Sequence, residues 1–348
     1  MYIAILNYNN WRDTVECLES ILLLKSVDFK VIIVDNNSDD HSLENIELWL
    51  NNNLNLAFKF KVPGTPVCYP ERPVKYSRFH YIDPEFKSIR LIQDSKITLI
   101  EAQENSGYAG GNNLAIKYAL KEDDFDYIWI LNNDTVVHPD SLRHLQDKAR
   151  EYHDKNKKIG IIGSKIYHYY NPKKIQYAGG SKYYKYGAYS RALGKDEYDH
   201  GQWNNEDIKM DLIAGSSMFV SKKFIKEVGL LGEQYFLYFE ELDWNLRGIK
   251  SGWNLGYCPE SVIYHKEGSA TGTNNINSTL SELSFFYSVR NKILFTKTYF
   301  PYCIIWVYMG LIWIIIQRII DGRIGLIPMI FKIFFNQKRY LKSKWIAT

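Results

Sequence analysis

Short apolar segments alternate with amphipathic segments through the first 134 residues, and this alternation is what most constrains the fold. The apolar segments have the length of strands and the amphipathic ones have helical spacing: Tyr2–Leu6, Trp11–Leu24, Lys30–Val34, Leu43–Leu50, Ile97–Ile100, Leu114–Leu120 and Tyr127–Leu131. Strands separated by helices predict the α/β class with a mostly parallel sheet. Such sheets bind ligands beyond the carboxyl ends of their strands.

Polar clusters directly follow three of the predicted strands. Residues 7–9 (Asn-Tyr-Asn) follow the first strand, residues 35–39 (Asp-Asn-Asn-Ser-Asp) the second, and residues 132–134 (Asn-Asn-Asp) the strand that ends at Leu131. Because parallel strands end at the same edge of a sheet, we expect these three loops to lie close together. The sequence therefore predicts one polar site at this edge.

The rest of the chain departs from this alternation. Residues 51–95 are rich in Asn, Pro and Lys, and we expect a surface insertion there, either a plain loop or a lid. Alternating runs rich in Tyr and Gly in residues 159–220 indicate β-hairpins. Helical spacing returns in residues 222–228, 238–250 and 280–297.

Charge divides the chain into two chemically different parts. The 43 Lys and Arg residues against 39 Asp and Glu give a net charge of +4, but ten basic residues and one acidic residue lie between Arg290 and Thr348, which leaves 33 against 38 in residues 1–289. A hydrophobic share of 46% excludes a disordered chain and favours a globular body. The four cysteines lie too far apart in sequence to suggest a zinc motif or a disulfide framework, and the first residues do not have the pattern of a signal peptide. We therefore expect the body of the protein in the reducing cytosol.

The basic C-terminal part, residues 299–348, is also apolar. Thr298–Gln317 is a run of 20 uncharged residues, and a shorter apolar stretch covers Ile324–Phe335. A spanning helix needs about 20 apolar residues, so three arrangements stay open: a helix in the plane of the membrane surface, which we favour, a single span, and a buried helix at a dimer interface. Four further basic residues favour an anionic lipid surface on the cytoplasmic side: Lys338, Arg339, Lys342 and Lys344.

Two of the polar motifs have a structural interpretation beside a functional one. Asp35 could accept the N3–H of a uracil or thymine ring, because a carboxylate only accepts hydrogen bonds, or Asp35 and Ser38 could cap the following helix. The glycine-rich residues 105–113 could face a diphosphate at a helix N-terminus or form an ordinary turn. This segment lacks the G-x-G-x-x-G spacing of dinucleotide-binding folds.

Acidic residues and one histidine complete the candidate set. Residues 132–134 offer the oxygen ligands that Mg²⁺ or Mn²⁺ takes, or a plain turn. The acids of residues 240–243 (Glu-Glu-Leu-Asp) begin a predicted helix and complement its dipole. The aromatic run directly before them could instead raise the proton affinity of a carboxylate and make it a general base. His265 could be a structural histidine or a nitrogen ligand for an ion at Asp134.

Taken in order, these motifs resemble those of the family 2 inverting glycosyltransferases, in particular the rhamnosyltransferase-like branch. The resemblance spans residues 2 to about 298 and rests on seven segments: Asn7–Asn9, Val34–Ser38, Asn105–Asn113, Leu131–Asp134, Gly215–Met218, Phe236–Asp243 and Val262–His265. It implies the GT-A fold, in which a nucleotide-binding α/β half (about 1–135) is continuous with an acceptor-binding half (about 136–298). It also implies a divalent metal, Mg²⁺ or Mn²⁺, and a nucleoside-diphosphate sugar, which we expect to be linked to UDP or dTDP.

The resemblance also implies a role for each motif residue. Donor contacts would come from Asn7, Tyr8, Asn9, Asp35, Asn36, Asn105, Gly107, Gly111, Asn113, Asn132 and Asn133. Metal binding would fall to Asp134 and His265. The catalytic base of the family corresponds to Glu241, with Glu240 as the alternative, and the acceptor region would include Gly215, Glu240 and Asp243.

We therefore expect an inverting glycosyltransferase in which Glu241 removes the proton of an acceptor hydroxyl while the metal at Asp134 offsets charge on the leaving diphosphate. Rhamnose is one candidate sugar, and the acceptor would be a glycan or a polyprenyl-linked saccharide used for a surface polysaccharide. The protein would act at the cytoplasmic face of the membrane, as a monomer or a homo-oligomer, and without a nucleic-acid partner. The alternative is a noncatalytic scaffold that binds nucleotide sugars or glycans. A nicotinamide dehydrogenase is disfavoured because the dinucleotide fingerprint is missing.

Overall fold

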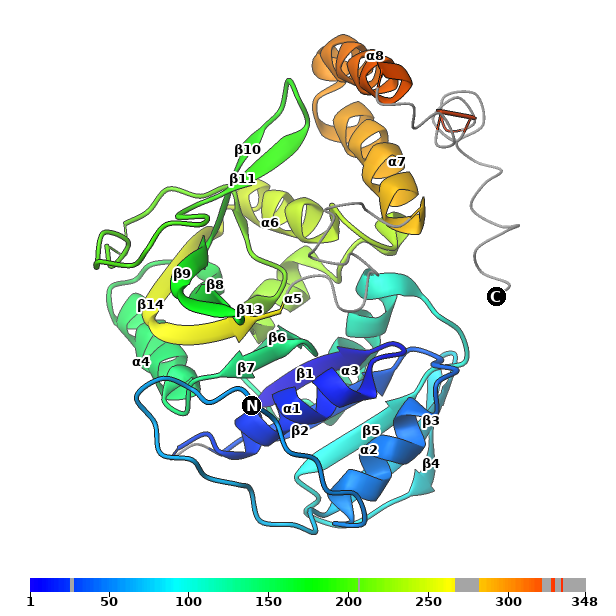
Figure 1. Cartoon of the computed structure of the whole chain (residues 1–348), viewed down its shortest axis with the longest axis vertical. Coiled ribbons are helices and arrows are strands. Elements are labelled where there is room, and N and C mark those ends of the chain that lie inside the picture. Colours follow the sequence, from blue (N-terminus) through cyan, green and yellow to red (C-terminus); the bar gives the residue numbers. More distant parts are fainter. Residues whose placement is uncertain (26–27, 206, 267–281, 321–326, 329–332, 334–348) are drawn as a thin grey trace.

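A computed structural model describes residues 1–25, 28–205, 207–266, 282–320, 327–328 and 333 (Figure 1). Most of the second apolar stretch expected at Ile324–Phe335 lies outside these residues. The basic residues at positions 338, 339, 342 and 344 lie outside them as well.

A mixed sheet crosses the middle of the protein (Figure 1). Its strands are β1 (Tyr2–Asn7), β2 (Lys30–Asp35), β3 (Tyr76–Ile82), β4 (Glu85–Arg90), β5 (Ile97–Glu101), β6 (Tyr127–Asn132), β7 (Thr135–Val137), β8 (Ile159–His168), β9 (Asn171–Ala178), β13 (Ser217–Ser221) and β14 (Asn254–His265). The spatial order is β4-β3-β5-β2-β1-β6-β13-β8-β14-β7, and β9 pairs with β8 outside this path. The α/β class inferred from the alternation is therefore confirmed, but the sheet is mixed and not mostly parallel, because β4, β7, β9 and β13 pair antiparallel with their neighbours.

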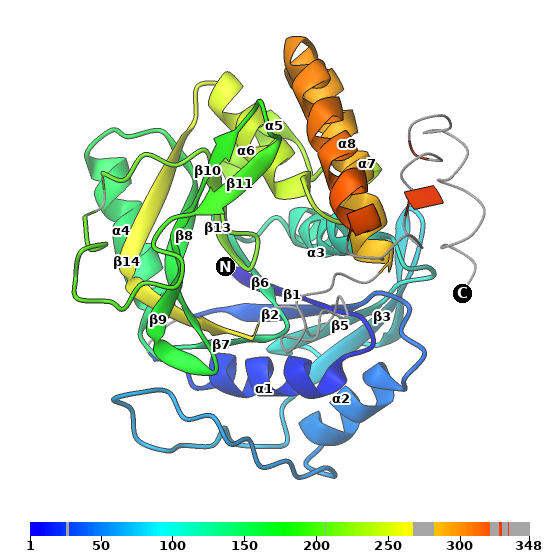
Figure 2. The same ribbon diagram turned by 45° about the horizontal axis from the view of Figure 1, so that its top comes forward.

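Helices cover both faces of this sheet (Figure 2). One face carries α1 (Trp11–Leu22), α2 (Ser42–Leu50) and α4 (Ser141–Asp154), and the other carries α3 (Gly107–Glu122), α5 (Lys222–Val228) and α6 (Glu240–Lys250). Alternate residues of a strand point to opposite faces, so Ile3 and Ile5 of β1 pack with the first layer and Tyr2 and Ala4 with the second. The sequences of β1, β2 and β6 are largely apolar because both of their faces are covered.

The register of the strands brings the three polar loops to one edge, as predicted. β1 pairs in parallel with β2 and β6, so that Asn7 lies opposite Asp35 and Leu6 opposite Asn132. β13 runs antiparallel between β6 and β8, and β14 is parallel to β8. β8 and β14 therefore run in the same direction as β6, and their last residues, His168 and His265, lie beyond the same side of the sheet.

Residues 51–95 differ from the surface insertion expected from their composition. β3 joins the main sheet in parallel with β5, and β4 forms its outer edge. These strands are hard to recognise in the sequence because they contain charged residues. Arg78 of β3 forms ion pairs with Glu47 and Glu101, and nearly all of β4 is exposed. An irregular segment covers residues 51–75 only.

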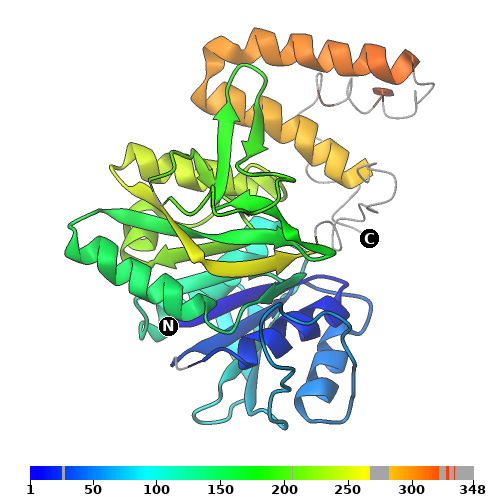
Figure 3. The same ribbon diagram turned by 60° about the vertical axis from the view of Figure 1, so that its left-hand side comes forward.

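The segment rich in Tyr and Gly forms hairpins, as predicted. β8 and β9 pair antiparallel, and the chain then leaves the main sheet at Gly179 and Gly180. β10 (Gly180–Tyr184) and β11 (Tyr189–Ala192) form a second hairpin, and β12 (Leu212–Ile213) pairs with β10. The β10–β11 hairpin projects from the body of the protein (Figure 3).

Two helices end the described chain. The first of them, α7 (Glu282–Tyr299), leads through a 3₁₀ turn at Pro301–Cys303 into the second, α8 (Ile304–Ile320). Another 3₁₀ turn, at Glu233–Tyr235, precedes α6. α8 lies on α7 near the hairpin (Figure 3). Within the described ranges, none of the helices combines the length and the apolar character that crossing a membrane would require.

Gly163 of β8 tests how tightly the sheet is packed where β9 leads into β10. A Cβ atom added at Gly163 would lie 2.4 Å from the carbonyl oxygen of Gly179. Because backbone atoms must move to relieve this contact, Gly163→Ala should lower the free energy of unfolding in urea by about 1–3 kcal/mol. Gly310→Ala in α8 is the control, since a Cβ there meets nothing within 4 Å. Equal stability of Gly163→Ala and wild type would contradict the close packing.

Candidate active site

The carboxyl ends of β1 and β2 hold a buried hydrogen-bonded group around Asp35. Asn7 donates from Nδ2 to Asp35 Oδ1 at 2.7 Å, and Ser38 donates to the same carboxylate from its backbone N–H at 3.1 Å and its hydroxyl at 2.6 Å. Thr14 of α1 donates to Asn7 at 2.6 Å. Burial raises the pKa of Asp35, although these hydrogen bonds act to lower it. The N-cap of α2 is His41, so the interpretation of Asp35 and Ser38 as a helix cap is wrong.

Tyr8 and Asn9 lie at the surface above this group. Asn9 is exposed and has a left-handed φ of 49°, and Tyr8 is half-buried. The Asn9 backbone N–H donates to the Ser38 hydroxyl at 2.9 Å, and the Asn9 side chain accepts from the Asp39 N–H at 2.8 Å. These bonds join the two loops and leave Tyr8 and Asn9 accessible to a ligand.

Asn36 fastens the glycine-rich segment to the end of β2. Its Nδ2 donates to Asn105 Oδ1 at 2.9 Å and to the carbonyl of Gly107 at 3.2 Å, and its Oδ1 accepts from the Ser106 N–H at 3.2 Å. Gly107 begins α3 with a φ of +72°, and a Cβ there would lie 2.3 Å from the carbonyl oxygen of Phe236. A residue without a side chain is therefore required at this approach.

Asp134 and His265, which the sequence analysis paired as metal ligands, lie side by side in the structure and are both buried. His265 Nε2 lies 3.0 Å from Asp134 Oδ1, and His265 Nδ1 lies 2.7 Å from Gln176 Oε1 of β9. Because an amide oxygen only accepts, Nδ1 carries a hydrogen and Nε2 faces Asp134. Burial acts to raise the pKa of Asp134, but His265 and the more distant Lys266 outweigh it and leave the pKa below its usual value.

The donor set at this pair fits a divalent cation. Among the residues that the structure describes, no group of three or more His, Cys, Asp or Glu side chains could hold a metal. Asn132 adds a third donor, because its Oδ1 is buried without a hydrogen-bond partner in the described part of the chain and its Nδ2 lies 3.5 Å from His265 Nε2. A carboxylate, an imidazole and an amide oxygen suit Mn²⁺ that takes its other ligands from phosphates.

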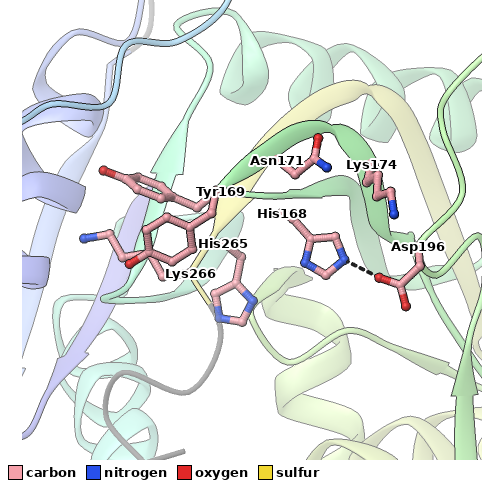
Figure 4. A pocket seen from close by; sticks show the side chains of 8 residues that line it. His168, Tyr169, Asn171, Lys174, Asp196, His265 and Lys266 are labelled. Atoms are coloured by element: carbon pink, nitrogen blue, oxygen red, sulfur yellow. Dashed lines mark ion pairs between the residues drawn. The ribbon is translucent and has the colours of Figure 1, made fainter. Parts of the chain in front are cut away.

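A pocket of about 350 Å³ opens beside His265 (Figure 4). It is lined by His168, Tyr169, Tyr170, Asn171, Lys174, Asp196, His265 and Lys266. His168 is in register with His265 on the neighbouring strand and pairs with Asp196 at 3.0 Å. Phe60 stacks on Tyr169 with ring centroids 4.3 Å apart, so the irregular segment 51–75 borders this pocket.

The backbone is strained directly before the acidic residues of α6. Phe236, Tyr238 and Phe239 have φ values of 63°, 67° and 75°, which side chains disfavour. Such conformations cost about 1–3 kcal/mol each and persist only where the surroundings enforce them. Asn291 of α7 does so, because its Nδ2 donates to three carbonyls within residues 235–238 at 2.8–2.9 Å. This arrangement fixes the start of α6.

Glu241 faces the N-terminal end of α3. A Cβ added at Gly215 would lie 3.2 Å from Glu241 Oε1, and the Tyr108 hydroxyl donates to the Gly215 carbonyl at 2.6 Å. Glu240 is only 3% exposed, whereas Glu241 is half-buried. Burial raises the pKa of both carboxyl groups, and the charge of Glu241 raises that of Glu240 further. Burial raises the pKa of Tyr108, and the charges of Glu241, Glu240 and Asp134 raise it further.

Two residues that the resemblance assigns to the donor have other partners. Asn113 donates from Nδ2 to the Leu231 carbonyl at 3.0 Å and accepts from the Leu231 N–H at 3.0 Å, so it holds the loop before α6 instead of facing a ligand. Gly111 lies under Leu6, where a Cβ would come within 2.3 Å of that side chain. Its role is the close packing of α3 on β1.

Asn133 and Asp243 likewise connect elements around the site. Asn133 donates to Thr14 of α1 at 3.0 Å. Asp243 accepts from the Tyr299 hydroxyl at 2.5 Å and from Arg247 at 2.8 Å, so that it ties α6 to α7. Asn133 and Asp243 thus hold neighbouring elements together, and their roles toward donor and acceptor stay predictions.

Three residues at the site escaped the sequence analysis as individual candidates: Tyr108, His168 and Gln176. Tyr108 lies within the glycine-rich motif, where an aromatic residue was a usable signal. His168 was visible only as part of an alternating hairpin. Gln176 has no sequence signal, because its contact with His265 depends on the pairing of β9 with β8 and of β8 with β14.

Comparison with known proteins identifies similar sequences and a similar fold. Residues 2–62 and 84–228 match the family described as Glycosyl transferase family 2. The low-salt glycan biosynthesis hexosyltransferase Agl10 of Haloferax volcanii is 25% identical over 209 residues, which are 59% of this chain and 61% of that protein. The chain thus spans less than two thirds of that relative's length.

Two further similarities are shorter or more distant. An N-acetylglucosaminyl-diphospho-decaprenol L-rhamnosyltransferase of Mycobacterium tuberculosis is 33% identical over 60 residues, 17% of this chain and 20% of that protein. The crystal structure of GalNAc-T7 with UDP, GalNAc and Mn²⁺ has a TM-score of 0.51 at 11% identity, over 76% of this chain and 43% of that one. This last likeness concerns the fold alone.

Asn113 provides a test of how the site is held together. Asn113→Ala leaves the buried N–H and carbonyl of Leu231 without partners, so we expect a loss of about 2 kcal/mol in the free energy of unfolding, measured in urea. Asn53→Ala, at an exposed position, is the matched control and should stay within about 0.5 kcal/mol of wild type. Unchanged stability of Asn113→Ala would return this residue to the set of ligand contacts.

Proposed function

The chain belongs to glycosyl transferase family 2, and on that premise we propose that it is a metal-dependent inverting glycosyltransferase with Glu241 as its base. The observation that carries this proposal is the position of the Glu241 carboxylate, which faces Gly215 and Tyr108 at the N-terminus of α3. The backbone N–H of Asn132 donates to the Ser216 carbonyl at 3.2 Å, which places the end of β6 next to Gly215. A base and a cation site thus flank the end of α3, where backbone N–H groups favour an anion.

The nucleoside of the donor would bind at the loops that follow β1 and β2. Tyr8 and Asn9 are accessible there, and Asp35 lies between them and the sheet. A carboxylate has about four acceptor positions, and three hydrogen bonds from Asn7 and Ser38 occupy three of them. The fourth suits the N3–H of uracil or thymine, which supports a UDP- or dTDP-linked donor.

The donor diphosphate would lie between the glycine-rich segment and the cation site. Asp134, His265 and the Asn132 amide oxygen would hold Mn²⁺ or Mg²⁺, with the imidazole favouring Mn²⁺. The bound ion would offset the charge that develops on the diphosphate as it leaves. Asn36 and Gly107 keep the backbone of the glycine-rich segment close to this position.

The transfer is a single displacement. Glu241 takes the proton of an acceptor hydroxyl while that oxygen forms a bond to the anomeric carbon of the donor sugar. The bond from this carbon to the diphosphate oxygen breaks on the opposite side, so the anomeric configuration inverts. Burial raises the pKa of Glu241 and so strengthens it as a base.

The sugar and the acceptor that we propose are taken from the names of the relatives. One relative is named a hexosyltransferase of glycan biosynthesis and another a rhamnosyltransferase with a decaprenol-linked acceptor. We propose transfer of a hexose or of rhamnose to a saccharide that is linked to a membrane lipid, at the cytoplasmic face of the membrane. The noncatalytic scaffold is the competing function, and Glu241 would then be dispensable for everything that the protein does.

Replacing Glu241, and as a control Glu240, by glutamine distinguishes the glycosyltransferase from the noncatalytic scaffold. Glu241→Gln keeps the shape of the side chain but not its basicity, so release of UDP or dTDP from a panel of nucleotide sugars should fall by about 10²–10⁴-fold. UDP binding by calorimetry should stay within about twofold, since this carboxylate lies outside the proposed nucleoside site. In wild type, turnover should fall as the pH drops through a pKa above the usual value of glutamate, because only the carboxylate accepts the proton.

Glu240→Gln is the matched control for this experiment. Because Glu240 is buried, we expect less than about a tenfold loss of turnover from its replacement. A large loss in Glu240→Gln with activity kept in Glu241→Gln would make Glu240 the base. Full activity in both variants would refute the proposed mechanism.

The cation site can be tested without turnover. In Gln176→Leu the acceptor that orients His265 is lost, so Mn²⁺ affinity in the presence of UDP should fall by about 10–100-fold in calorimetric titration. Asp134→Asn should abolish Mn²⁺ binding, because the anionic ligand is removed. Gln93→Leu, at an exposed position, should bind Mn²⁺ as wild type does. Wild-type affinity in both Gln176→Leu and Asp134→Asn would place the metal elsewhere.

A further inference from the structure

α8 presents a broad apolar face to its surroundings. Eight large side chains, each 42–75% exposed, lie three or four positions apart along the helix: Ile305, Trp306, Met309, Ile312, Trp313, Ile316, Ile319 and Ile320. The opposite side of α8 is packed, since Val307 and Leu311 are 1% exposed and cluster with residues of α7. Contiguous apolar surface of this extent marks an interaction site.

The tip of the β10–β11 hairpin continues this face. Ala188 is fully buried in the cluster formed by α7 and α8, which fixes the hairpin against them (Figure 3). Tyr186 meets Trp306 edge to face with ring centroids 6.5 Å apart, and Lys185 Nζ donates to the Tyr302 hydroxyl at 3.2 Å. More than a hundred residues of sequence separate the two elements, yet these contacts bring them together. Both carry exposed aromatic rings: Tyr184, Tyr186 and Tyr189 in the hairpin, and Tyr302, Trp306 and Trp313 at the helical end.

The part of the sequence that contains α8 is basic. The run Thr298–Gln317 has no charged residue, whereas the chain from Arg290 to Thr348 carries ten basic residues and one acidic residue. A symmetric dimer through α8 would bring the same patch of each copy together, and the two basic regions would repel each other. An anionic lipid surface complements both the apolar face and this charge.

We propose that the outer face of α8 and the tip of the β10–β11 hairpin form one docking surface for an anionic lipid bilayer. α8 lies in the plane of the bilayer, because its packing on α7 prevents lipid from surrounding it. The Trp and Tyr rings take the interfacial position that aromatic side chains prefer. The hairpin adds a second point of contact, so the protein is held in one orientation.

This surface is connected to the proposed catalytic residue. Phe236, Leu237 and Tyr238 belong to the same cluster as Val307 and Leu311 of α8, and Asn291 bonds to the backbone of this aromatic run. The run leads directly into α6 and Glu241. Docking would thus fix Glu241 relative to the bilayer, and, resting here on the proposed function, we infer that the hydroxyl it deprotonates belongs to a lipid-linked saccharide.

Vesicle sedimentation with the full chain tests the docking surface. Wild type should bind vesicles of phosphatidylglycerol and phosphatidylcholine, and less so pure phosphatidylcholine or the mixture at 1 M NaCl. Ile312→Ser/Trp313→Ser should lower the partition coefficient at least about tenfold, and Tyr186→Ser about threefold to tenfold, because each removes apolar area from the contact. Leu91→Ser/Tyr69→Ser is the control with similar exposed side chains away from this surface and should bind as wild type does.

A second measurement applies where a serine variant fails to fold. Brominated acyl chains should quench part of the tryptophan fluorescence of wild type, and this part should be absent in Trp306→Phe/Trp313→Phe, which keeps the aromatic packing. Equal quenching in both proteins, or wild-type binding by the serine variants, would overturn the proposal. A wild-type dimer that the serine variants convert to monomers, with vesicle binding unchanged, would assign α8 to a second copy instead.

These experiments test the proposal of a docking surface independently of the proposed activity. Glu241→Gln should bind vesicles as wild type does, since it lies outside the surface. The α8 and hairpin variants should keep their affinity for UDP and Mn²⁺. Vesicle binding without nucleotide-sugar turnover would retain the docking surface and remove only the inference about the acceptor.

Discussion

The covering of both sheet faces by helices is the constraint on which the rest of the structure depends. Residues on either face of β1, β2 and β6 are buried among apolar side chains, so polar groups can gather only where these strands end. Parallel strands put those ends on one edge. The Asn, Asp and His side chains of the site therefore lie in a short row at the ends of the strands, where they are buried or partly buried.

Hydrogen bonds among these side chains decide which of them remain available for a ligand. Asn7, Asn36 and Asn113 use their amides to satisfy loop backbone or neighbouring side chains. A buried polar group without a partner is costly, which explains why these amides are bonded to loop backbone and to neighbouring side chains. The oxygen of Asn132, which has no hydrogen-bond partner among the residues that the structure describes, is informative for the same reason, because a cation would compensate it.

Parts of the chain that are distant in sequence cooperate at the start of α6. The left-handed residues before Glu241 would be unfavourable on their own, and Asn291 of α7 compensates them with hydrogen bonds to their carbonyls. α7 in turn carries α8 and contacts the β10–β11 hairpin. A single cluster of aromatic and aliphatic side chains thus connects the proposed base to the apolar surface of the protein.

The sequence by itself determined the α/β class, the edge where the polar loops meet, the hairpins of residues 159–220 and the family to which the chain belongs. Apolar periodicity and polar clusters are local signals in the sequence. Because the strands pair in parallel register, the polar clusters that follow them become neighbours in space. Only the tertiary structure decided that β3 extends the sheet, that Asn113 and Asp243 serve the scaffold, and that Gln176 orients His265. These features depend on which strands and helices pack side by side, and a residue's own neighbours in sequence carry no information about such long-range pairing.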